Sequence, residues 1–326
     1  MRILFISHGF QPEPNVFVGL PFAKELVRRG HAVEVLTDFP NYPGGKIYPG
    51  YKMRPLMRET MEGIPVIRVP LYPSHDESPF KRMLCYTSFA LSASTIGTWA
   101  VRPADVAYVV QGPITVGLPA CILKLLKGIP FVFHIHDLWP DSLLSTGMFN
   151  NKLVLKLVDG WCNFVYQRAA KIVTITPGMK QRLIERGVSE DKIEVIYNWC
   201  DDSLICRAEP NEELAKTLGM SGRFNIVFAG NMGKAQAYMA AGRPILIGVP
   251  GDATDLVVKA NAGLPCEPEN PQSIAETVLK FYSLPHAQLD AMGQNGKAFY
   301  DKHLCFSIAA EKFERIFQEL SLKKHK

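Results

Sequence analysis

Short apolar runs alternate with helical patterns along most of this chain, and that alternation restricts its fold more than any other feature. Ile3–Ser7 and His31–Thr37 have the composition of buried strands, while Gly19–Arg29 between them has helical spacing and stops at a glycine. Further strand-like runs follow at Ala104–Val110, Ile129–Ile135, Lys171–Ile175 and Ile193–Tyr197. Strand–helix alternation of this kind predicts an α/β fold with a parallel, doubly wound sheet.

The alternation restarts after Trp199–Asp202, where we predict a domain boundary. The strands predicted beyond it are Phe224–Ala229, Pro244–Gly248 and Gly263–Cys266, and the helices are Glu209–Leu218, Thr254–Ala260, Pro271–Phe281 and Ser307–Leu320. Three strands are few, because a doubly wound domain usually carries about five or six. The sequence therefore predicts two Rossmann-like domains, residues 1–200 and residues 201–326, of which the second is incomplete.

Charge and cysteine content narrow the class of protein. Residues 1–200 hold 22 Lys and Arg against 16 Asp and Glu, whereas residues 201–326 hold 14 against 15. A basic first domain suits an anionic membrane surface or a phosphorylated substrate. Nucleic acid is not a predicted partner, since no dense basic helix or aromatic-basic array occurs. Seven scattered cysteines without a C-x-x-C predict reduced, packed thiols in a cytoplasmic protein.

The segment Met83–Val101 has no charged residue over 19 residues, which is long enough to test as a membrane span. Its polar side chains fall on one side of a helix, however, so the pattern is amphipathic. The polar positions are Thr87, Ser88, Ser92, Ser94, Thr95 and Thr98, and the opposite side carries Tyr86, Phe89, Ala90, Ala93, Ile96 and Ala100. We expect a helix packed on the core or one lying on a membrane surface, with Lys81, Arg82 and Arg102 at the headgroups.

Two histidines and an aspartate stand where a predicted buried strand ends. His134, His136 and Asp137 follow directly from the apolar run that begins at Ile129. In open α/β sheets, ligands bind outside the carboxyl ends of the strands, so these side chains are candidate substrate contacts. His134 lies two residues earlier, on the same strand face as His136. It can be a substrate contact or a buried structural histidine, and we favour the structural interpretation.

Several short segments, in their order and spacing, make the chain similar to the family 4 glycosyltransferases of GT-B architecture, in particular the branch that builds bacterial O-antigen and capsule. These segments are residues 1–13, Ala23–Thr37, His136–Ser142, Thr176–Lys180, Ile196–Trp199, Phe228–Met232, Ala237–Pro244 and Met292–Gly296. The resemblance implies two Rossmann-like domains that face each other across a cleft, with residues 1–200 on the acceptor and membrane side and residues 201–326 binding the nucleotide sugar. It also implies sugar transfer from a nucleotide diphosphate donor.

The resemblance assigns roles to individual residues. His136 would contact the donor sugar and Asp137 would bind an acceptor hydroxyl, or cap its loop. Gly19, at the start of a helix, would lie near the donor diphosphate, while Asn231 and Lys234 would bind the donor phosphates; each of these three also fits an ordinary loop. The resemblance implies a UDP- or GDP-sugar as donor and no cofactor. No D-x-D lies at a strand end and no cluster of His, Cys or Asp has the spacing of metal ligands, so the sequence predicts no metal site.

One departure from the family concerns the second domain. Gly233–Gln236 runs directly into Ala237, where members of the family have several further strand–helix units. The later of two glutamates typical of the family would fall at Ala237, and the earlier one would lie in the missing stretch. The chain therefore resembles a family member with an internal deletion near residues 233–237.

The leading hypothesis is a retaining glycosyltransferase that moves a sugar from a nucleotide-diphosphate sugar onto a lipid-linked saccharide in O-antigen or capsule biosynthesis. We expect it in the cytoplasm, peripheral at the inner face of the cytoplasmic membrane, with an anionic membrane surface as a partner. One alternative is a shortened, non-catalytic protein that binds acceptor or membrane. Another is a sugar-nucleotide epimerase of the same architecture, which would need no acceptor.

Overall fold

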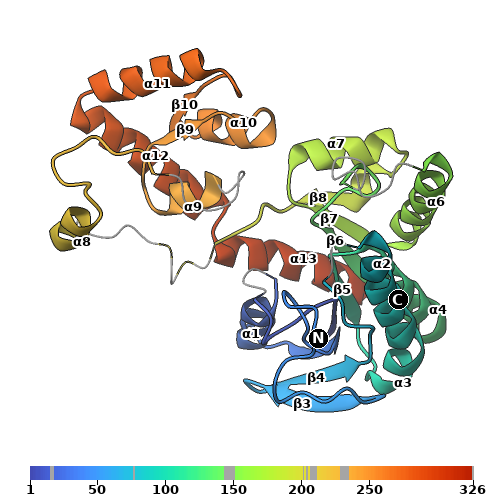
Figure 1. Cartoon of the computed structure of the whole chain (residues 1–326). Helices are drawn as coiled ribbons and strands as arrows, with labels where there is room; N and C mark the ends of the chain where they lie inside the picture. The colour runs from blue at the N-terminus through green and yellow to red at the C-terminus, as the bar shows by residue number, and fades with distance from the viewer. Residues whose placement is uncertain are drawn as a thin grey trace. The chain divides into compact units, whose positions relative to one another are not determined.

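The chain divides into two compact units, Met1–Ile196 with Ala310–Lys326, and Tyr197–Ala309. This description rests on a computed structural model, which describes residues 1–14, 18–75, 78–142, 151–200, 202, 205, 211–227 and 235–324 (Figure 1). The predicted domains, 1–200 and 201–326, differ from these units at the carboxyl-terminal end. Residues 310–326 belong to the first unit and not to the second.

An eight-stranded sheet with the order β3-β4-β2-β1-β5-β6-β7-β8 forms the centre of the first unit. Its strands are β1 (Arg2–Ser7), β2 (Ala32–Asp38), β3 (Met57–Met61), β4 (Ile64–Val69), β5 (Val106–Gln111), β6 (Phe131–Ile135), β7 (Lys171–Thr174) and β8 (Ile193–Val195). All neighbouring strands are parallel except β3 and β4, which form an antiparallel pair. The predicted α/β fold with a mostly parallel sheet is confirmed.

Helices cover both faces of this sheet (Figure 1). Those of the first unit are α1 (Leu20–Arg28), α2 (Pro79–Ser92), a π-helical turn (Ala93–Gly97), α3 (Thr98–Ala100), α4 (Gly117–Lys127), α6 (Lys152–Arg168), α7 (Pro177–Glu185) and most of α13 (Phe306–Lys324). One core joins Leu4, Ile6 and Val109 of the sheet to buried side chains of α2, α4 and α6. Because side chains alternate along a strand, Phe5 and Tyr108 point to the opposite face.

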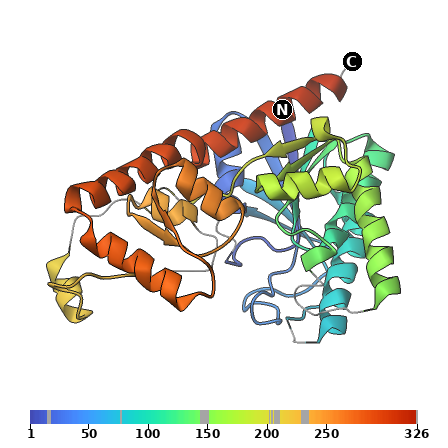
Figure 2. The same cartoon turned by 90° about the horizontal axis from the view of Figure 1, so that it is seen from above.

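Helix α13 covers that opposite face beside α1 (Figures 1 and 2). The Phe313 ring is fully buried, with its centroid 5.2 Å from those of Phe22 and Tyr108. Glu314 accepts a hydrogen bond from Arg29 at 3.0 Å and lies 2.9 Å from His31 Nε2. These contacts explain why the helix belongs to the first unit. Its amphipathic pattern predicts a helix without showing which sheet its apolar side covers.

The uncharged segment Met83–Val101 forms most of α2, the π-helical turn and α3. Phe89, Ala90 and Ala93 are buried on the side that the pattern predicts, although Thr98 is buried too. Among the residues that the structure describes, no helix is both long enough and apolar enough to cross a bilayer.

The second unit contains a two-stranded parallel sheet in its described part, β9 (Ile245–Ile247) and β10 (Gly263–Pro265). Its helices are α8 (Glu212–Thr217), α9 (Ala235–Ala240), α10 (Asp252–Lys259), α11 (Pro271–Ser283), α12 (His286–His303) and the start of α13. The predicted strand Phe224–Ala229 is wrong for residues 224–227, and residues 228–229 lie outside the described part. Phe224, Ile226 and Val227 are exposed, and none of the strands that the structure describes pairs with them.

Candidate functional site

The polar strand ends of the first unit meet at one edge of its sheet. From β1 the chain proceeds to β2 on one side, and later to β5, β6, β7 and β8 on the other. The strand order therefore reverses between β1 and β5, and ligands of doubly wound proteins bind beside such a switch point, at the carboxyl ends of the strands. His136 follows β6, which lies next to β5.

The two histidines of the β6 segment differ in environment. His134 is fully buried, its Nδ1 lies 2.6 Å from the Tyr108 hydroxyl, and its ring centroid lies 5.1 Å from that of Phe313. Burial, together with the neighbouring His136, holds the pKa of His134 well below its usual value. A buried, hydrogen-bonded ring agrees with the structural role that we favour for His134.

His136 lies nearer the edge and on the same sheet face, with its ring centroid 4.2 Å from that of His134. The residue as a whole is half-buried, but its Nε2 atom is covered and has no hydrogen-bond partner among the described residues. Burial lowers the pKa of His136 to about 4. At neutral pH the ring is therefore uncharged.

The loop after β6 is tied to helix α7. Arg186, at the end of α7, donates hydrogen bonds to the Trp139 carbonyl oxygen and to Asp141 Oδ1, both at 2.7 Å. Asp137 is exposed. Burial raises the pKa of Tyr86 on α2, and the Asp137 charge contributes to that rise, so the carboxylate lies within electrostatic reach of this ring. Burial also raises the pKa of Asp137 itself.

Gly19 caps the amino terminus of α1 and is buried. The Leu20 amide after it donates a hydrogen bond to Gln11 Oε1 at 2.8 Å. Because α1 and α13 cover the sheet face to which His134 and His136 point, Gly19 and His136 share one edge and one face. The other predicted phosphate contacts, Asn231 and Lys234, lie outside the described residues.

A cluster of buried polar groups at the same edge is absent from the sequence-based site. Asp38, fully buried at the end of β2, accepts a hydrogen bond from the Gly9 amide at 2.8 Å and lies 3.4 Å from His8 Nε2. Glu13 accepts hydrogen bonds from the Asn41 and Tyr42 amides. Burial and, to a smaller extent, the Asp38 carboxylate raise the pKa of Glu13 to about 7.

Arg68 neutralises part of this cluster from β4. Its side chain is fully buried, donates to the Asp38 carbonyl oxygen at 2.7 Å, and pairs with Glu59. It also donates to the Gln11 carbonyl oxygen. A buried guanidinium with these partners ties the loops that follow β1 and β2 to the sheet.

Gln111, the last residue of β5, is fully buried, and neither polar atom of its amide has a hydrogen-bond partner among the described residues. The signal that singles out His136, a polar residue at the end of a buried strand, is also present at His8, Asp38 and Gln111. Applying it to every strand would have found all three. No group of three or more His, Cys, Asp or Glu in the described part of the chain could hold a metal ion.

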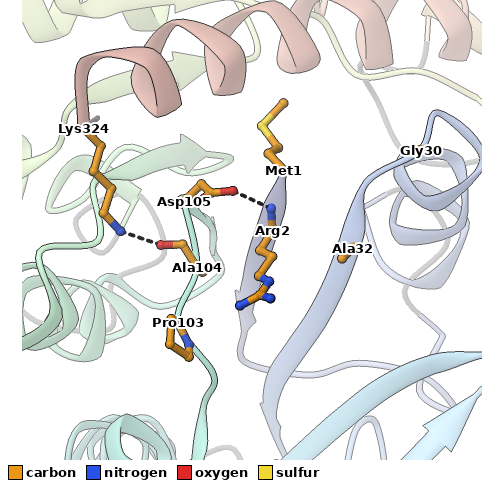
Figure 3. A pocket seen from close by; sticks show the side chains of 8 residues that line it. All are labelled: Met1, Arg2, Gly30, Ala32, Pro103, Ala104, Asp105 and Lys324. Carbon is orange, nitrogen blue, oxygen red and sulfur yellow. Dashed lines mark hydrogen bonds between the residues drawn. The ribbon is translucent and has the colours of Figure 1, made fainter. Parts of the chain in front are cut away.

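A pocket of about 530 Å³ lies at the opposite, amino-terminal edge of the sheet (Figure 3). In it the Arg2 amide donates to Asp105 Oδ2, and Lys324 Nζ donates to the Ala104 carbonyl oxygen, both at 2.7 Å. Ligands of doubly wound sheets bind at the carboxyl ends of the strands, so this pocket is not the candidate site.

A mostly parallel sheet with polar strand ends at its switch point defines a doubly wound α/β protein. A model of the "Glycosyl transferase 4-like domain" matches residues 20–199, more than half of the chain, so the chain belongs to that family. It is 28% identical over 211 residues to the "Putative colanic acid biosynthesis glycosyl transferase WcaI" of Escherichia coli (strain K12). That match covers 62% of this chain and 51% of WcaI, so the chain spans about half the length of this relative.

Solved structures support the fold. The structure of Anabaena HepE in complex with UDP and glucose matches with a TM-score of 0.65 at 13% identity, covering 98% of this chain and 99% of HepE. WaaG, a glycosyltransferase involved in lipopolysaccharide biosynthesis, matches with a TM-score of 0.54 at 14% identity, covering 97% and 99%. The fold is therefore that of GT-B glycosyltransferases.

Proposed function

We propose that this chain is a retaining glycosyltransferase that moves a sugar from a nucleotide-diphosphate sugar to a lipid-linked saccharide in bacterial surface polysaccharide biosynthesis. Family membership, the similarity to WcaI and the fold shared with HepE support this proposal. The observation that carries it is the position of His136, whose Nε2 is covered and unpaired among the described residues, at the carboxyl edge beside the switch point.

An uncharged imidazole suits sugar transfer with an oxocarbenium-like transition state. Positive charge develops on the sugar ring as the bond to the diphosphate breaks. A protonated His136 would repel that charge, whereas the neutral ring that its low pKa ensures offers hydrogen bonding without repulsion. His136 would therefore contact the donor sugar in the proposed mechanism.

The leaving diphosphate needs a counter-charge. The amino terminus of α1, which Gly19 caps, carries a partial positive charge that stabilises anions. We propose that it faces the donor phosphates, and that Asn231 and Lys234 contribute further hydrogen bonds and charge. A UDP- or GDP-sugar then suffices as donor, without a metal ion.

A surface of α2 and α3 suits the lipid-linked acceptor. Phe80, Leu84 and Leu91 form one exposed stripe of α2, and the Trp99 side chain on α3 is 80% exposed. Lys81, next to Phe80 in the helix, is exposed, so apolar and basic groups together match an anionic membrane surface. Trp99→Ser should weaken co-sedimentation with phosphatidylglycerol vesicles, and unchanged co-sedimentation would contradict the peripheral membrane proposal.

Transfer by a His136→Ala variant tests the catalytic proposal. Loss of one polar contact to the transition state should lower kcat about 10²–10³-fold while circular dichroism stays unchanged. His286→Ala, an exposed histidine at the start of α12, is the matched control and should keep full activity. Normal turnover of His136→Ala would remove this residue from the mechanism.

Three measurements on the unchanged protein separate the alternatives. Calorimetry with UDP and GDP should detect binding, and its absence would favour the shortened, non-catalytic protein. Release of an altered sugar nucleotide without acceptor would favour the epimerase. The anomeric configuration of the product, read by NMR, should equal that of the donor; an inverted product would contradict the retaining mechanism.

A further inference from the structure

One buried arginine connects three segments at the carboxyl edge of the first unit. Arg68 of β4 is fully buried, and each of its three side-chain nitrogen atoms donates to a different segment. Nε bonds to Glu59 on β3, and Nη1 bonds to the Asp38 carbonyl oxygen at the end of β2 at 2.7 Å. Nη2 bonds to the Gln11 carbonyl oxygen, in the loop after β1. The planar fork of a guanidinium lets one side chain hold all three.

Stability alone does not account for an arginine at this position. Taking a guanidinium out of water is costly, and apolar side chains of similar volume often stabilise a protein as well as a buried ion pair does. An apolar side chain could not, however, fix the direction of the Gln11 and Asp38 carbonyl groups. The feature that requires Arg68 is therefore the exact course of the loops after β1 and β2.

Gln11 passes this constraint on to helix α1. Its Oε1 accepts a hydrogen bond at 2.8 Å from the amide of Leu20, the first residue of the helix. The second residue, Pro21, has no amide hydrogen to donate. Arg68 thus holds the backbone of Gln11, and the Gln11 side chain holds the amino terminus of α1.

We propose that Arg68 and Gln11 are positioning residues for the donor, which fix the amino terminus of α1 where it meets the donor diphosphate. This inference rests on the proposed function, which assigns the donor phosphates to this end of the helix. A helix terminus stabilises an anion only over about its first turn, so its position matters. Neither residue touches the reacting atoms, because Arg68 acts through Gln11 and Gln11 acts through Leu20.

A carboxylate at position 11 separates this role from a purely structural one. Gln11→Glu keeps an oxygen that can accept from the Leu20 amide, and a negative charge near a helix amino terminus stabilises the helix. The Tm of the variant should therefore stay the same or rise. The same charge repels the donor diphosphate, so UDP binding should weaken about tenfold. A purely structural Gln11 would leave UDP binding unchanged.

Calorimetry with UDP and with GDP, at pH 8 so that the new carboxyl group is ionised, measures this effect. The difference between Gln11→Glu and the unchanged protein should shrink in 0.5 M NaCl, because salt screens the repulsion. Gln318→Glu is the matched control, since it adds the same charge at an exposed position of α13. It should bind the nucleotide as the unchanged protein does.

Arg68→Lys tests the other positioning residue. Lysine keeps the positive charge, but a compact ammonium cannot reproduce the fork that reaches all three segments. UDP binding should weaken about tenfold, and in turnover assays KM for the donor should rise while kcat stays within about twofold. Arg29→Lys is the matched control at the opposite end of α1, where Arg29 binds Glu25 and Glu314. It should lower Tm and leave UDP binding unchanged.

The outcomes separate this inference from the proposed function. Normal UDP binding by Gln11→Glu, or equal losses of UDP binding in Arg68→Lys and Arg29→Lys, would overturn the positioning role and leave the proposed function standing. Absence of both UDP and GDP binding by the unchanged protein would overturn the two together. The titrations need neither acceptor nor turnover.

Discussion

The sheets of the two units differ in how their strands are held. In the first unit, β5 has a parallel neighbour on each side and all six of its residues are buried. In the second unit, β9 and β10 have three residues each and, in the described part, only one another as neighbours. The difference shows that the edge carrying His136, His8 and Gln111 rests on the more strongly constrained sheet. The described sheet of the second unit, which is expected to bind the nucleotide, has fewer neighbouring strands to hold it in place.

Hydrogen exchange gives the largest contrast between the units. Amides of β5 can exchange only when the eight-stranded sheet opens, whereas β9 and β10 can open locally. We expect β5 amides to exchange at least about 10³-fold more slowly than those of Ile245–Ile247, as measured by NMR or mass spectrometry. Equal protection would break the comparison and would indicate that one cooperative unit includes both sheets.

Removing the Phe313 ring sharpens the comparison at α13. Phe313→Ala should lower the free energy of unfolding by about 3–5 kcal/mol, because the buried ring packs on Phe22 and Tyr108. Leu322→Ala, at a 68% exposed position of the same helix, should change it by less than about 0.5 kcal/mol. Urea denaturation measures both. If Phe313→Ala speeds hydrogen exchange in β9 and not in β5, α13 stabilises the second unit, which would contradict its assignment to the first unit.

A buried carboxyl makes the first unit sensitive to pH. The pKa of Glu13 rises from 4.5 to about 7 on folding, mainly because the group is buried. The folded chain therefore keeps a proton that the unfolded chain has released, and stability falls as pH rises from about 4.5 to about 7. Glu13→Gln removes this loss, so the stability of the variant relative to the wild type should rise by about 3 kcal/mol across that window.

Urea denaturation at several pH values measures this difference. His136, whose pKa falls from 6.5 to about 4, gives the opposite slope, since stability is lost as pH falls through that range. The slope of His136 is present in both proteins and cancels in the comparison. A difference between variant and wild type that does not change with pH would show that Glu13 is ionised throughout.

Two helical glycines give the smallest effects, with opposite signs. Gly293→Ala in α12 should destabilise the second unit by about 1–3 kcal/mol, because its Cβ would lie 2.2 Å from the Gly242 carbonyl oxygen. Gly160→Ala in α6 meets no atom within 4 Å and should stabilise the first unit by up to about 1 kcal/mol. Thermal denaturation of both variants measures the changes. A harmless Gly293→Ala would show that the second unit packs more loosely than described.

Local patterns predict much of the first unit and less of the rest. The buried strands that form β1, β2, β5 and β6 are clear from their apolar runs. The hairpin of β3 and β4 is missed, because its signal is a short turn at Glu62 and Gly63, where both φ angles are positive. The position of α13 depends on contacts with residues far away in the chain, which no local pattern contains.

The candidate site shows the same division. His136 stands out because two histidines and an aspartate follow one strand, a pattern visible in a single segment. His8, Asp38 and Gln111 come from three segments, and they form a row only when β2, β1 and β5 lie side by side. For residues 224–227, apolar composition predicts a strand, but a strand also needs a neighbour, and the described part of the second unit provides none for them.

The assignment of Ala310–Lys326 to the first unit has a consequence for synthesis on the ribosome. The sheet that begins at β1 is complete after residue 196, yet Phe22 and Tyr108 gain their covering aromatic ring only when residue 313 leaves the exit tunnel. The whole second unit is translated in between. During that interval Phe22 and Tyr108 lack this ring, and exposed apolar surface of this kind makes folding intermediates prone to aggregation.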